Sequence, residues 1–231
     1  MSAGIAVIVC ARDEAERLPA TLAALAAALG GARVLVADDG SRDATAAVAR
    51  AAGVEVVSAP RRLGKGGAAT LAAWRVGAGD VVVLCDGDLA ASAAHLVRLA
   101  DAVRGGEADL AVGAFESRAG GGFGLAHGFA RWAVRRRCGL TLDAPISGQR
   151  ALSPAALAAA LPFAPRFGME IGMTIDVARA GLRVREYPLP LAHRATGRSL
   201  RGFLHRGRQL ADFAAVYRVS RRPGRRRSRR L

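Results

Sequence analysis

The feature that most constrains the fold is a run of five apolar residues, 81–85, that leads directly into Asp86-Gly87-Asp88. An apolar run of this length that ends in a turn signal is typical of a strand buried on both faces. Such a strand delivers two carboxylates to its carboxyl end, where ligands bind in open α/β sheets. Close carboxylates repel each other unless a cation or proton lies between them, and Mg2+ and Mn2+ favour oxygen ligands. The triplet therefore predicts a metal site, although Asp-Gly alone is equally typical of an ordinary turn.

Each of the three strands predicted before this one is also followed by a polar cluster. The strands are expected over 4–10, 33–37 and 54–58, and the clusters over 11–14, 38–41 and 61–67. Helices are expected over 17–29 and 43–52, from the Gly-rich segment to 76, and over 92–104, before a strand at 108–113. This alternation predicts an α/β fold with a largely parallel sheet, helices on both faces and the clusters along one edge.

The second half is less regular. We expect a helix over 124–138, a turn-rich segment over 142–150 leading into a short strand, and a loop over 162–167. A helix over 168–180, a strand over 183–187 and a final helix over 199–219 follow. The expected organisation is one catalytic domain over 1–200, a helical extension over 201–220 and a disordered Arg-rich tail over 221–231.

The net charge of +15 is concentrated near the carboxyl terminus. After His193 there are thirteen arginines and one acidic residue, Asp212, which gives +12. Such a tail either binds an anionic membrane surface or is simply solvated. With only 5% aromatic residues, no stacking platform is evident, and we expect no nucleic-acid partner. Three cysteines without metal spacing, no apolar window of 18 residues and no signal peptide favour a reduced, cytoplasmic protein.

The polar clusters together predict a nucleoside-diphosphate site. The Gly-rich segment contains Lys65, the only lysine of the chain, which can neutralise a diphosphate that a metal bridges. Asp39, at a strand end, is placed to accept hydrogen bonds from a base or ribose. The four clusters, in this order, resemble family 2 glycosyltransferases of the GT-A fold over roughly residues 4–200.

That resemblance implies a fold, a cofactor and a set of site residues. It implies that Asp86 and Asp88 hold Mg2+ or Mn2+. The nucleotide-sugar-binding residues that it implies are Ala11, Arg12, Glu14, Asp39, Gly64, Lys65, Asp86 and Gly87. One departure is Asp13, where the family usually has Asn before Glu.

Within this family the chain resembles the dolichyl- or polyprenyl-phosphate sugar synthases most. Their Asp-x-x-Ser-Gly-x-Arg pattern is matched, with one additional residue, by Asp143, Ser147, Gly148 and Arg150. The resemblance implies an acceptor or phosphate site made by Ser147, Gln149, Arg150, Arg194 and Arg198.

A second resemblance is to glucosyl-3-phosphoglycerate synthases, which use a late histidine as a metal ligand. It implies that His193 joins Asp86 and Asp88, whereas a surface or packing histidine is the alternative. The segment 167–172 is also similar, and it places Glu170 toward sugar or acceptor, unless Glu170 only favours the helix start. The catalytic residues expected are Asp88, Glu170 and Asp143.

Two acceptor classes follow for a hexose donated by a UDP-glucose or GDP-mannose type of nucleotide sugar. A polyprenyl phosphate is already ionised and needs no general base, and its use would place the enzyme at the inner face of the cell membrane. A soluble phosphorylated hydroxyl acceptor would need Asp143 or Glu170 as a base, or a substrate-assisted route. A nucleotide-sugar pyrophosphorylase is less well supported, because its Gly-rich signature after the first strand is absent.

Overall fold

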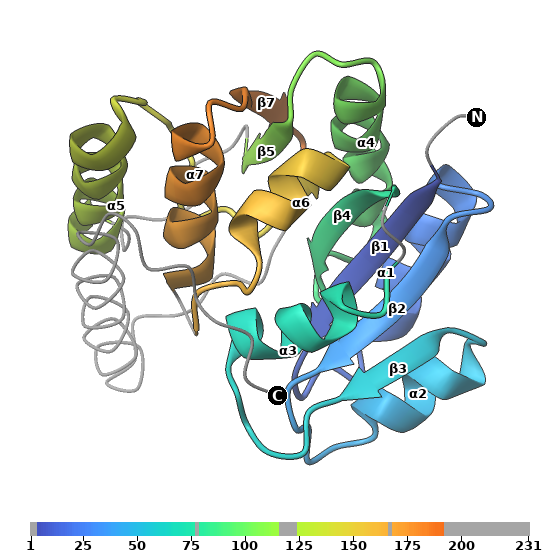
Figure 1. The fold of residues 1–231 in the computed structure, drawn as a ribbon. Helices are drawn as coiled ribbons and strands as arrows, with labels where there is room; N and C mark the ends of the chain where they lie inside the picture. The colour runs from blue at the N-terminus through green and yellow to red at the C-terminus, as the bar shows by residue number, and fades with distance from the viewer. Residues whose placement is uncertain (1–3, 77–78, 116–123, 166–167, 192–231) are drawn as a thin grey trace.

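A computed structural model of the protein describes residues 4–76, 79–115, 124–165 and 168–191 (Figure 1). Its centre is a seven-stranded sheet with the strand order β3-β2-β1-β4-β6-β5-β7. The strands are β1 (Ile5–Ala11), β2 (Arg33–Asp38), β3 (Glu55–Ser58), β4 (Val81–Asp86), β5 (Leu110–Phe115), β6 (Arg150–Leu152) and β7 (Val184–Leu189).

All neighbouring strands pair in parallel except at β6, which is antiparallel to both β4 and β5. The chain first moves outward from β1 through β2 to β3, and then returns to place β4 on the other side of β1. The strand order therefore reverses between β1 and β4. In open α/β sheets ligands bind outside the carboxyl ends of the strands at such a switch point, and β4 ends there with Asp86.

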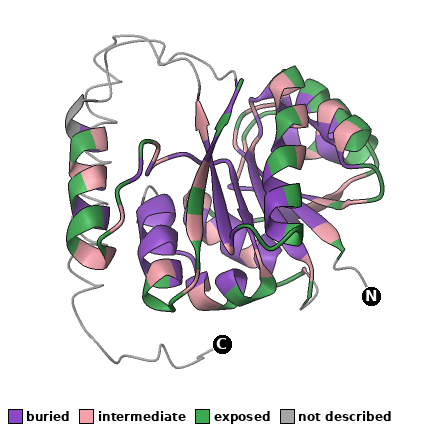
Figure 2. Cartoon of the chain, turned by 90° about the horizontal axis from the view of Figure 1, so that it is seen from above, coloured by how far each residue is buried: buried purple, intermediate pink, exposed green. Residues whose placement is uncertain are grey.

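The helices cover both faces of the sheet (Figures 1 and 2). One face packs against α1, α2, η1 and α4, and the other against α3, α6 and α7, while α5 packs on α7. The helices are α1 (Leu18–Ala28), α2 (Thr45–Ala51), α3 (Lys65–Ala73), the 3-10 helix η1 (Ala90–Leu96), α4 (Val97–Arg104), α5 (Gly124–Cys138), α6 (Pro154–Ala160) and α7 (Met169–Arg179).

The core strands are buried on both faces, as their continuous apolar sequences predict. In β4, Val81 and Val83 face the α1 side, whereas Val82 and Leu84 face the α3 side. Because side chains alternate along a strand, Asp86 continues the second series and lies on the side of α3 and α7. The face of the sheet on which Asp86 lies therefore determines which residues can reach its carboxylate.

The predicted elements agree with the structure except in two places. The helix expected over 92–104 begins as the 3-10 segment η1 and becomes α-helical only at Val97. Helix α6 was missed, although Ser153 caps it by accepting a hydrogen bond from the Ala156 N–H, and Pro154 stands at its first position. Ser-Pro before an Ala-rich run is a helix-start signal.

The predictions for the final helix over 199–219 and for the tail lie outside the described residues. Within the described segments, no helix is long and apolar enough to cross a membrane.

Candidate functional site

The first two polar clusters are joined by hydrogen bonds at the carboxyl edge of the sheet. The Asp13 N–H donates to Ser41 Oγ at 3.0 Å, and the Glu14 N–H donates to Thr45 Oγ1 at 2.9 Å. In return, Asp13 Oδ1 accepts from the Arg42 N–H at 2.8 Å. The loops after β1 and β2 therefore form one surface, which confirms that these clusters converge. Arg12 lies on this surface, with its Nε 3.7 Å from the Asp13 carboxylate.

Asp39 ties the Gly-rich segment to the same edge. Its backbone N–H donates to Ala11 O at 3.1 Å, and its buried Oδ1 accepts from the N–H groups of Leu63 (2.7 Å) and Gly64 (2.8 Å). Gly64 has a φ of 78°, a conformation that glycine adopts without strain. Asp39 thus fixes the loop that presents Lys65, and its expected contact with a nucleotide stays a prediction.

The buried Thr21, which the sequence analysis did not identify, stabilises the Asp86-Gly87-Asp88 turn by hydrogen bonds. Thr21 Oγ1 is fully buried, donates to Gly87 O at 2.9 Å and accepts from the Ala90 N–H at 2.8 Å. The Gly87 N–H donates to Cys10 O at 3.0 Å. The one signal in the sequence is a lone polar residue in the Ala-rich helix α1.

Asp86 is the centre of a charge cluster built from four separate segments. Lys65 Nζ lies 2.6 Å from Asp86 Oδ1 and 3.0 Å from Glu170 Oε1. The side-chain amide of Gln149 donates to Asp86 Oδ2 at 2.6 Å, and its oxygen accepts from the Asp86 N–H at 3.1 Å. Both oxygens of Asp86 are therefore engaged, and one ammonium joins two carboxylates.

The absence of a side chain at Gly148 leaves room for this cluster. A Cβ at this position would lie 2.2 Å from Lys65 Nζ and 2.7 Å from Asp86 Oδ2. Both distances are too short for real contacts, and the two atoms belong to the ion pair itself. The glycine of the Ser-Gly-Gln segment thus lets the chain pass directly over the Lys65–Asp86 pair.

The electrostatics of the cluster keep Lys65 charged and a nearby thiol neutral. Burial alone would lower the pKa of Lys65, but the attraction of Asp86 and then of Glu170 outweighs it, so the pKa is raised. Burial raises the pKa of the Cys10 thiol to about 12; Lys65 opposes this shift and Asp86 adds to it. Cys10 is therefore a protonated neighbour of the site at neutral pH, unsuited to act as a nucleophile.

The structure corrects the expectation for Arg150. Its side chain is fully buried, and it donates from Nε to Ser147 O at 2.8 Å, from Nη1 to Thr174 Oγ1 at 2.8 Å and from Nη2 to Pro145 O at 2.9 Å. Burial lowers its pKa to about 10, which leaves it charged at neutral pH. Since an acceptor phosphate cannot reach it, Arg150 supports the 145–147 loop instead.

Two other residues expected at the acceptor also turn inward. Ser147 is buried, and its Oγ accepts a 3.3 Å hydrogen bond from the Gln149 N–H. Gln149, also buried, is committed to Asp86. These residues shape the loop beneath the charge cluster, so their contribution to an acceptor would be indirect.

Asp143 lies on a different part of the surface. Its exposed carboxylate forms a 3.1 Å ion pair with Arg131 of α5, and its backbone N–H donates to Glu186 of β7 at 2.6 Å. The structure therefore brings Glu170, but not Asp143, into contact with the Lys65–Asp86 pair. The remaining predicted residues, His193, Arg194 and Arg198, lie outside the described residues.

The donor set at the edge suits a hard divalent cation. Asp86 and Asp88 stand one residue apart at the end of a buried strand, and the Lys65 ammonium already lies against Asp86. Two carboxylates this close in the chain repel each other unless a cation lies between them, and their oxygen atoms are the ligands that a hard divalent ion prefers. In the described part of the chain, no third His, Cys, Asp or Glu joins these two in a ready metal cluster.

A carboxylate pair at the β1/β4 switch point, next to a Gly-rich loop with a lysine, is the arrangement that the resemblance to GT-A glycosyltransferases implies. Residues 6–144 match the family model of glycosyl transferase family 2, which is more than half of the chain. The chain therefore belongs to this family of enzymes.

Two curated relatives match most of the chain. A glucosyl-3-phosphoglycerate synthase of Mycolicibacterium paratuberculosis is 32% identical over 250 residues, covering 93% of this chain and 69% of the relative. An undecaprenyl-phosphate mannosyltransferase of Micrococcus luteus is 34% identical over 214 residues, covering 84% of this chain and 86% of the relative. The relatives thus differ in acceptor, one being a phosphoglycerate enzyme and the other a lipid-phosphate enzyme.

Solved structures confirm the fold. Glucosyl-3-phosphoglycerate synthase from Mycobacterium tuberculosis with Mg2+ and uridine diphosphate is 29% identical, with a TM-score of 0.78 and coverage of 94% and 79% of the two chains. Its complex with Mn2+, UDP-glucose and phosphoglyceric acid gives a TM-score of 0.74 at 28% identity, covering 93% of this chain and 80% of that one. The two complexes of this one protein contain Mg2+ and Mn2+, the metals that the sequence resemblance implied.

Proposed function

We propose that this enzyme transfers a hexose from a UDP-glucose or GDP-mannose type of donor to a lipid-linked phosphate, with Mg2+ or Mn2+ as cofactor. The observation that carries the proposal is the Lys65–Asp86 pair, clamped by Gln149, at the switch point of the sheet. The anomeric carbon of the sugar exchanges its bond to the nucleoside diphosphate for a bond to an acceptor phosphate oxygen. The diphosphate leaves as the anion, and no oxidant or reductant is required.

The donor would be bound by the surface that the first three loops form. Asp39 and the Gly64 loop would hold the nucleotide beside residues Ala11, Arg12 and Glu14, while the charged Lys65 would neutralise part of the diphosphate. Asp86 and Asp88 would hold the metal, joined by His193. When bound, the metal supplies Lewis-acid stabilisation of the departing diphosphate.

The described carboxylates favour an acceptor that needs no general base. Glu170 Oε1 lies against the Lys65 ammonium at 3.0 Å, and the Asp143 carboxylate pairs with Arg131 at 3.1 Å. Each carboxylate therefore has a cationic partner, which it would have to leave in order to act as a general base toward a hydroxyl. A phosphate acceptor is already ionised near neutral pH and can attack without such a base.

A relative also supports a lipid phosphate as acceptor. The undecaprenyl-phosphate mannosyltransferase is 34% identical over 84% of this chain. Work on a lipid acceptor would place the enzyme peripherally at the inner face of the cell membrane. Transfer to a soluble phosphorylated hydroxyl is the second candidate, because the solved relatives include complexes with phosphoglyceric acid and glycerol 3-phosphate.

The test is a transfer assay with the full chain. UDP-glucose and GDP-mannose are each combined with undecaprenyl phosphate in detergent or with 3-phosphoglycerate, in Mn2+, Mg2+ or excess chelator, and products are identified by mass spectrometry. We expect a hexosyl lipid phosphate to form only when the metal is present. The Asp88→Asn variant serves as the control and should form no product. Product from phosphoglycerate alone would establish the second candidate, and equal transfer in chelator would contradict metal dependence.

A further inference from the structure

One side of α5 combines aromatic and basic side chains. At 3.6 residues per turn, Phe129, Trp132, Arg135 and Arg136 fall on one stripe of this helix. We call these four residues the α5 outer face. On the opposite side, small and aliphatic side chains pack against Ile171 and Ile175 of α7; they are Ala126, Ala130, Ala133 and Val134. The inner face therefore anchors α5. Within the outer face, Phe129 is partly buried against the same cluster, whereas Trp132, Arg135 and Arg136 are exposed.

Trp132 gives this face an apolar centre. Its side chain is 49% exposed, and it is one of two large hydrophobic residues that are exposed in the described segments. The Phe129 ring lies beside it, with a centroid separation of 5.5 Å. Because Phe129 is partly buried, the exposed apolar surface of this face is mainly the Trp132 indole, with the Phe129 ring at its edge.

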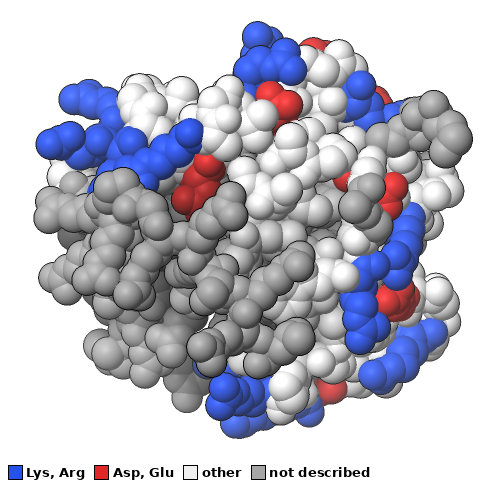
Figure 3. Space-filling model, in the orientation of Figure 1, with Lys and Arg blue, Asp and Glu red and all other residues white. Residues whose placement is uncertain are grey.

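The helix α5 itself contains basic and no acidic residues. From residue 117 to 142 the sequence contains five arginines and no acidic residue. Arg135 and Arg136 are exposed in the last turn of α5, and Arg131 lies at the edge of the face, 38% exposed and paired with Asp143. Figure 3 shows basic side chains gathered over the part of the molecule that α5 occupies in Figure 1.

We propose that the α5 outer face docks on the surface of an anionic lipid bilayer. Tryptophan is enriched at the boundary between acyl chains and headgroups, and arginines beside it reach the lipid phosphates. Each basic residue near an anionic surface strengthens binding about 5-fold, so Arg135 and Arg136 together contribute about 30-fold. This is weak, reversible docking, to which the +12 charge after His193 would add.

The chain itself offers a reporter for this contact, because it contains only two tryptophans, Trp74 and Trp132. Trp74, 62% exposed at the end of α3, is the matched control. The Trp74→Phe variant leaves Trp132 as the only indole, and Trp132→Phe leaves Trp74. Each full-length variant is mixed with neutral vesicles of phosphatidylcholine or with vesicles containing 30% phosphatidylglycerol, and its fluorescence is recorded with and without brominated lipids.

We expect a blue shift and bromolipid quenching of Trp132 on anionic vesicles only, and neither for Trp74. The double variant Arg135→Gln/Arg136→Gln should bind these vesicles about 30-fold more weakly in sedimentation. Arg50→Gln/Arg104→Gln, which removes exposed last-turn arginines from α2 and α4, should bind like the parent.

Vesicle binding without any change in Trp132 fluorescence would overturn the proposal and assign docking to another segment. The proposal would also be overturned if cutting the chain after Ser220 abolished binding while Arg135→Gln/Arg136→Gln left binding unaffected. A Trp132 response to duplex DNA but not to vesicles would assign the face to nucleic acid instead. The vesicles contain neither donor nor acceptor, so failure here leaves the proposed transfer reaction standing.

Discussion

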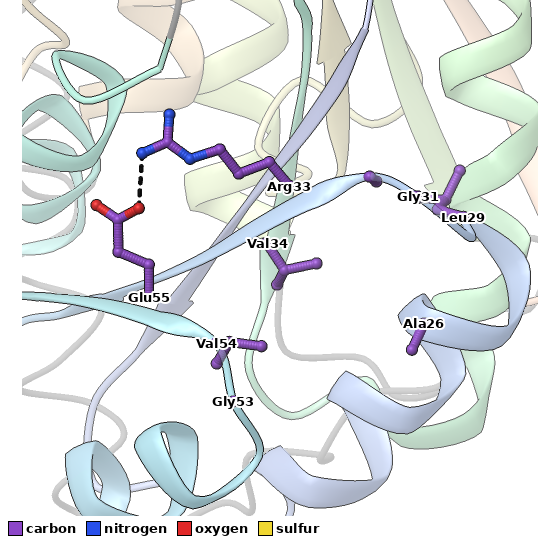
Figure 4. A pocket seen from close by; sticks show the side chains of 9 residues that line it. Ala26, Leu29, Gly31, Arg33, Val34, Gly53, Val54 and Glu55 are labelled. Atoms are coloured by element: carbon purple, nitrogen blue, oxygen red, sulfur yellow. Dashed lines mark hydrogen bonds and ion pairs between the residues drawn. The ribbon is translucent and has the colours of Figure 1, made fainter.

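Each edge of the sheet carries an ion pair with a nitrogen–oxygen distance of 2.6 Å, but the two pairs differ in exposure and in the other residues that contact them. At the carboxyl edge, Lys65 and Asp86 are 24% and 33% exposed. At the amino edge, Arg33 and Glu55 are 47% and 36% exposed beside a shallow pocket (Figure 4). The pocket is lined mainly by small and aliphatic residues from α1, β2 and the segment before β3.

The difference lies in the partners around each pair. Asp86 is held in addition by Gln149, and Lys65 by Glu170, so each charge of the carboxyl edge has a fixed second contact. Arg33 has one other contact, donating to Arg75 O at 2.8 Å. A short distance alone does not make a strong interaction, because solvent screens exposed pairs. The same distance thus indicates a functional cluster at one edge and an ordinary surface pair at the other.

The comparison predicts the largest effect for Asp88→Asn. The variant removes one carboxylate from the proposed metal site, and no described residue forms a hydrogen bond with the Asp88 side chain. We expect transfer to fall about 1000-fold, since metal stabilisation is worth several kcal/mol, with an unchanged melting temperature. Mn2+ binding, followed by electron paramagnetic resonance, should weaken in parallel; unaltered Mn2+ affinity would contradict the assignment.

Lys65→Met should give the next largest effect. Without the ammonium, the carboxylates of Asp86 and Glu170 lose the cation between them, and the unfolding free energy should fall by about 2 kcal/mol. Calorimetry should show weaker binding of the nucleoside diphosphate, with the free nucleoside as the control. Equal weakening of both ligands would mean that Lys65 acts only on the structure.

Gln149→Leu tests whether the amide positions Asp86. The variant keeps a similar volume but removes both hydrogen bonds to Asp86, and residues that orient metal ligands typically change affinity or activity 10- to 100-fold. We expect a loss in that range for Mn2+ affinity and for kcat. If the variant kept a normal Mn2+ affinity but lost thermal stability, Gln149 would contribute to packing and not to the position of Asp86.

Thr21→Val should have a smaller effect on catalysis than on stability. It leaves the Gly87 carbonyl and the Ala90 N–H without their buried partner, which costs about 1–3 kcal/mol. Urea denaturation measures this loss, and transfer should fall only several-fold because Asp86 keeps Lys65 and Gln149. If activity fell as far as in Asp88→Asn, the turn would depend on Thr21 more than its contacts indicate.

Arg33→Gln, at the opposite edge, should have the smallest effect. Exposed ion pairs contribute about 0–1 kcal/mol, so unfolding should change within that range. Transfer kinetics and Mn2+ affinity should equal those of the parent. A clear loss of activity would mean that the two edges are coupled, and would break the comparison on which the site assignment rests.

Much of the fold could be predicted because its signals are local. Continuous apolar runs located β1, β2 and β4, and the turn residues after each strand placed the polar clusters at one edge. A parallel sheet follows from the alternation of strands and helices. The Asp39 loop and the Asp86 turn were found in this way, and so was their convergence.

The partners within the site could not be read from the sequence, because they depend on how distant segments pack. Gln149 and Asp86 are 63 residues apart and meet only because β6 enters the sheet antiparallel beside β4. The same insertion buries Arg150, which the motif alone had placed at an acceptor phosphate. The sequence by itself determined which chemical groups stand at the strand ends, since that depends on local periodicity. Tertiary structure decided which groups touch and which are buried, because strand order and the side-chain parity of β4 set the contacts of each carboxylate.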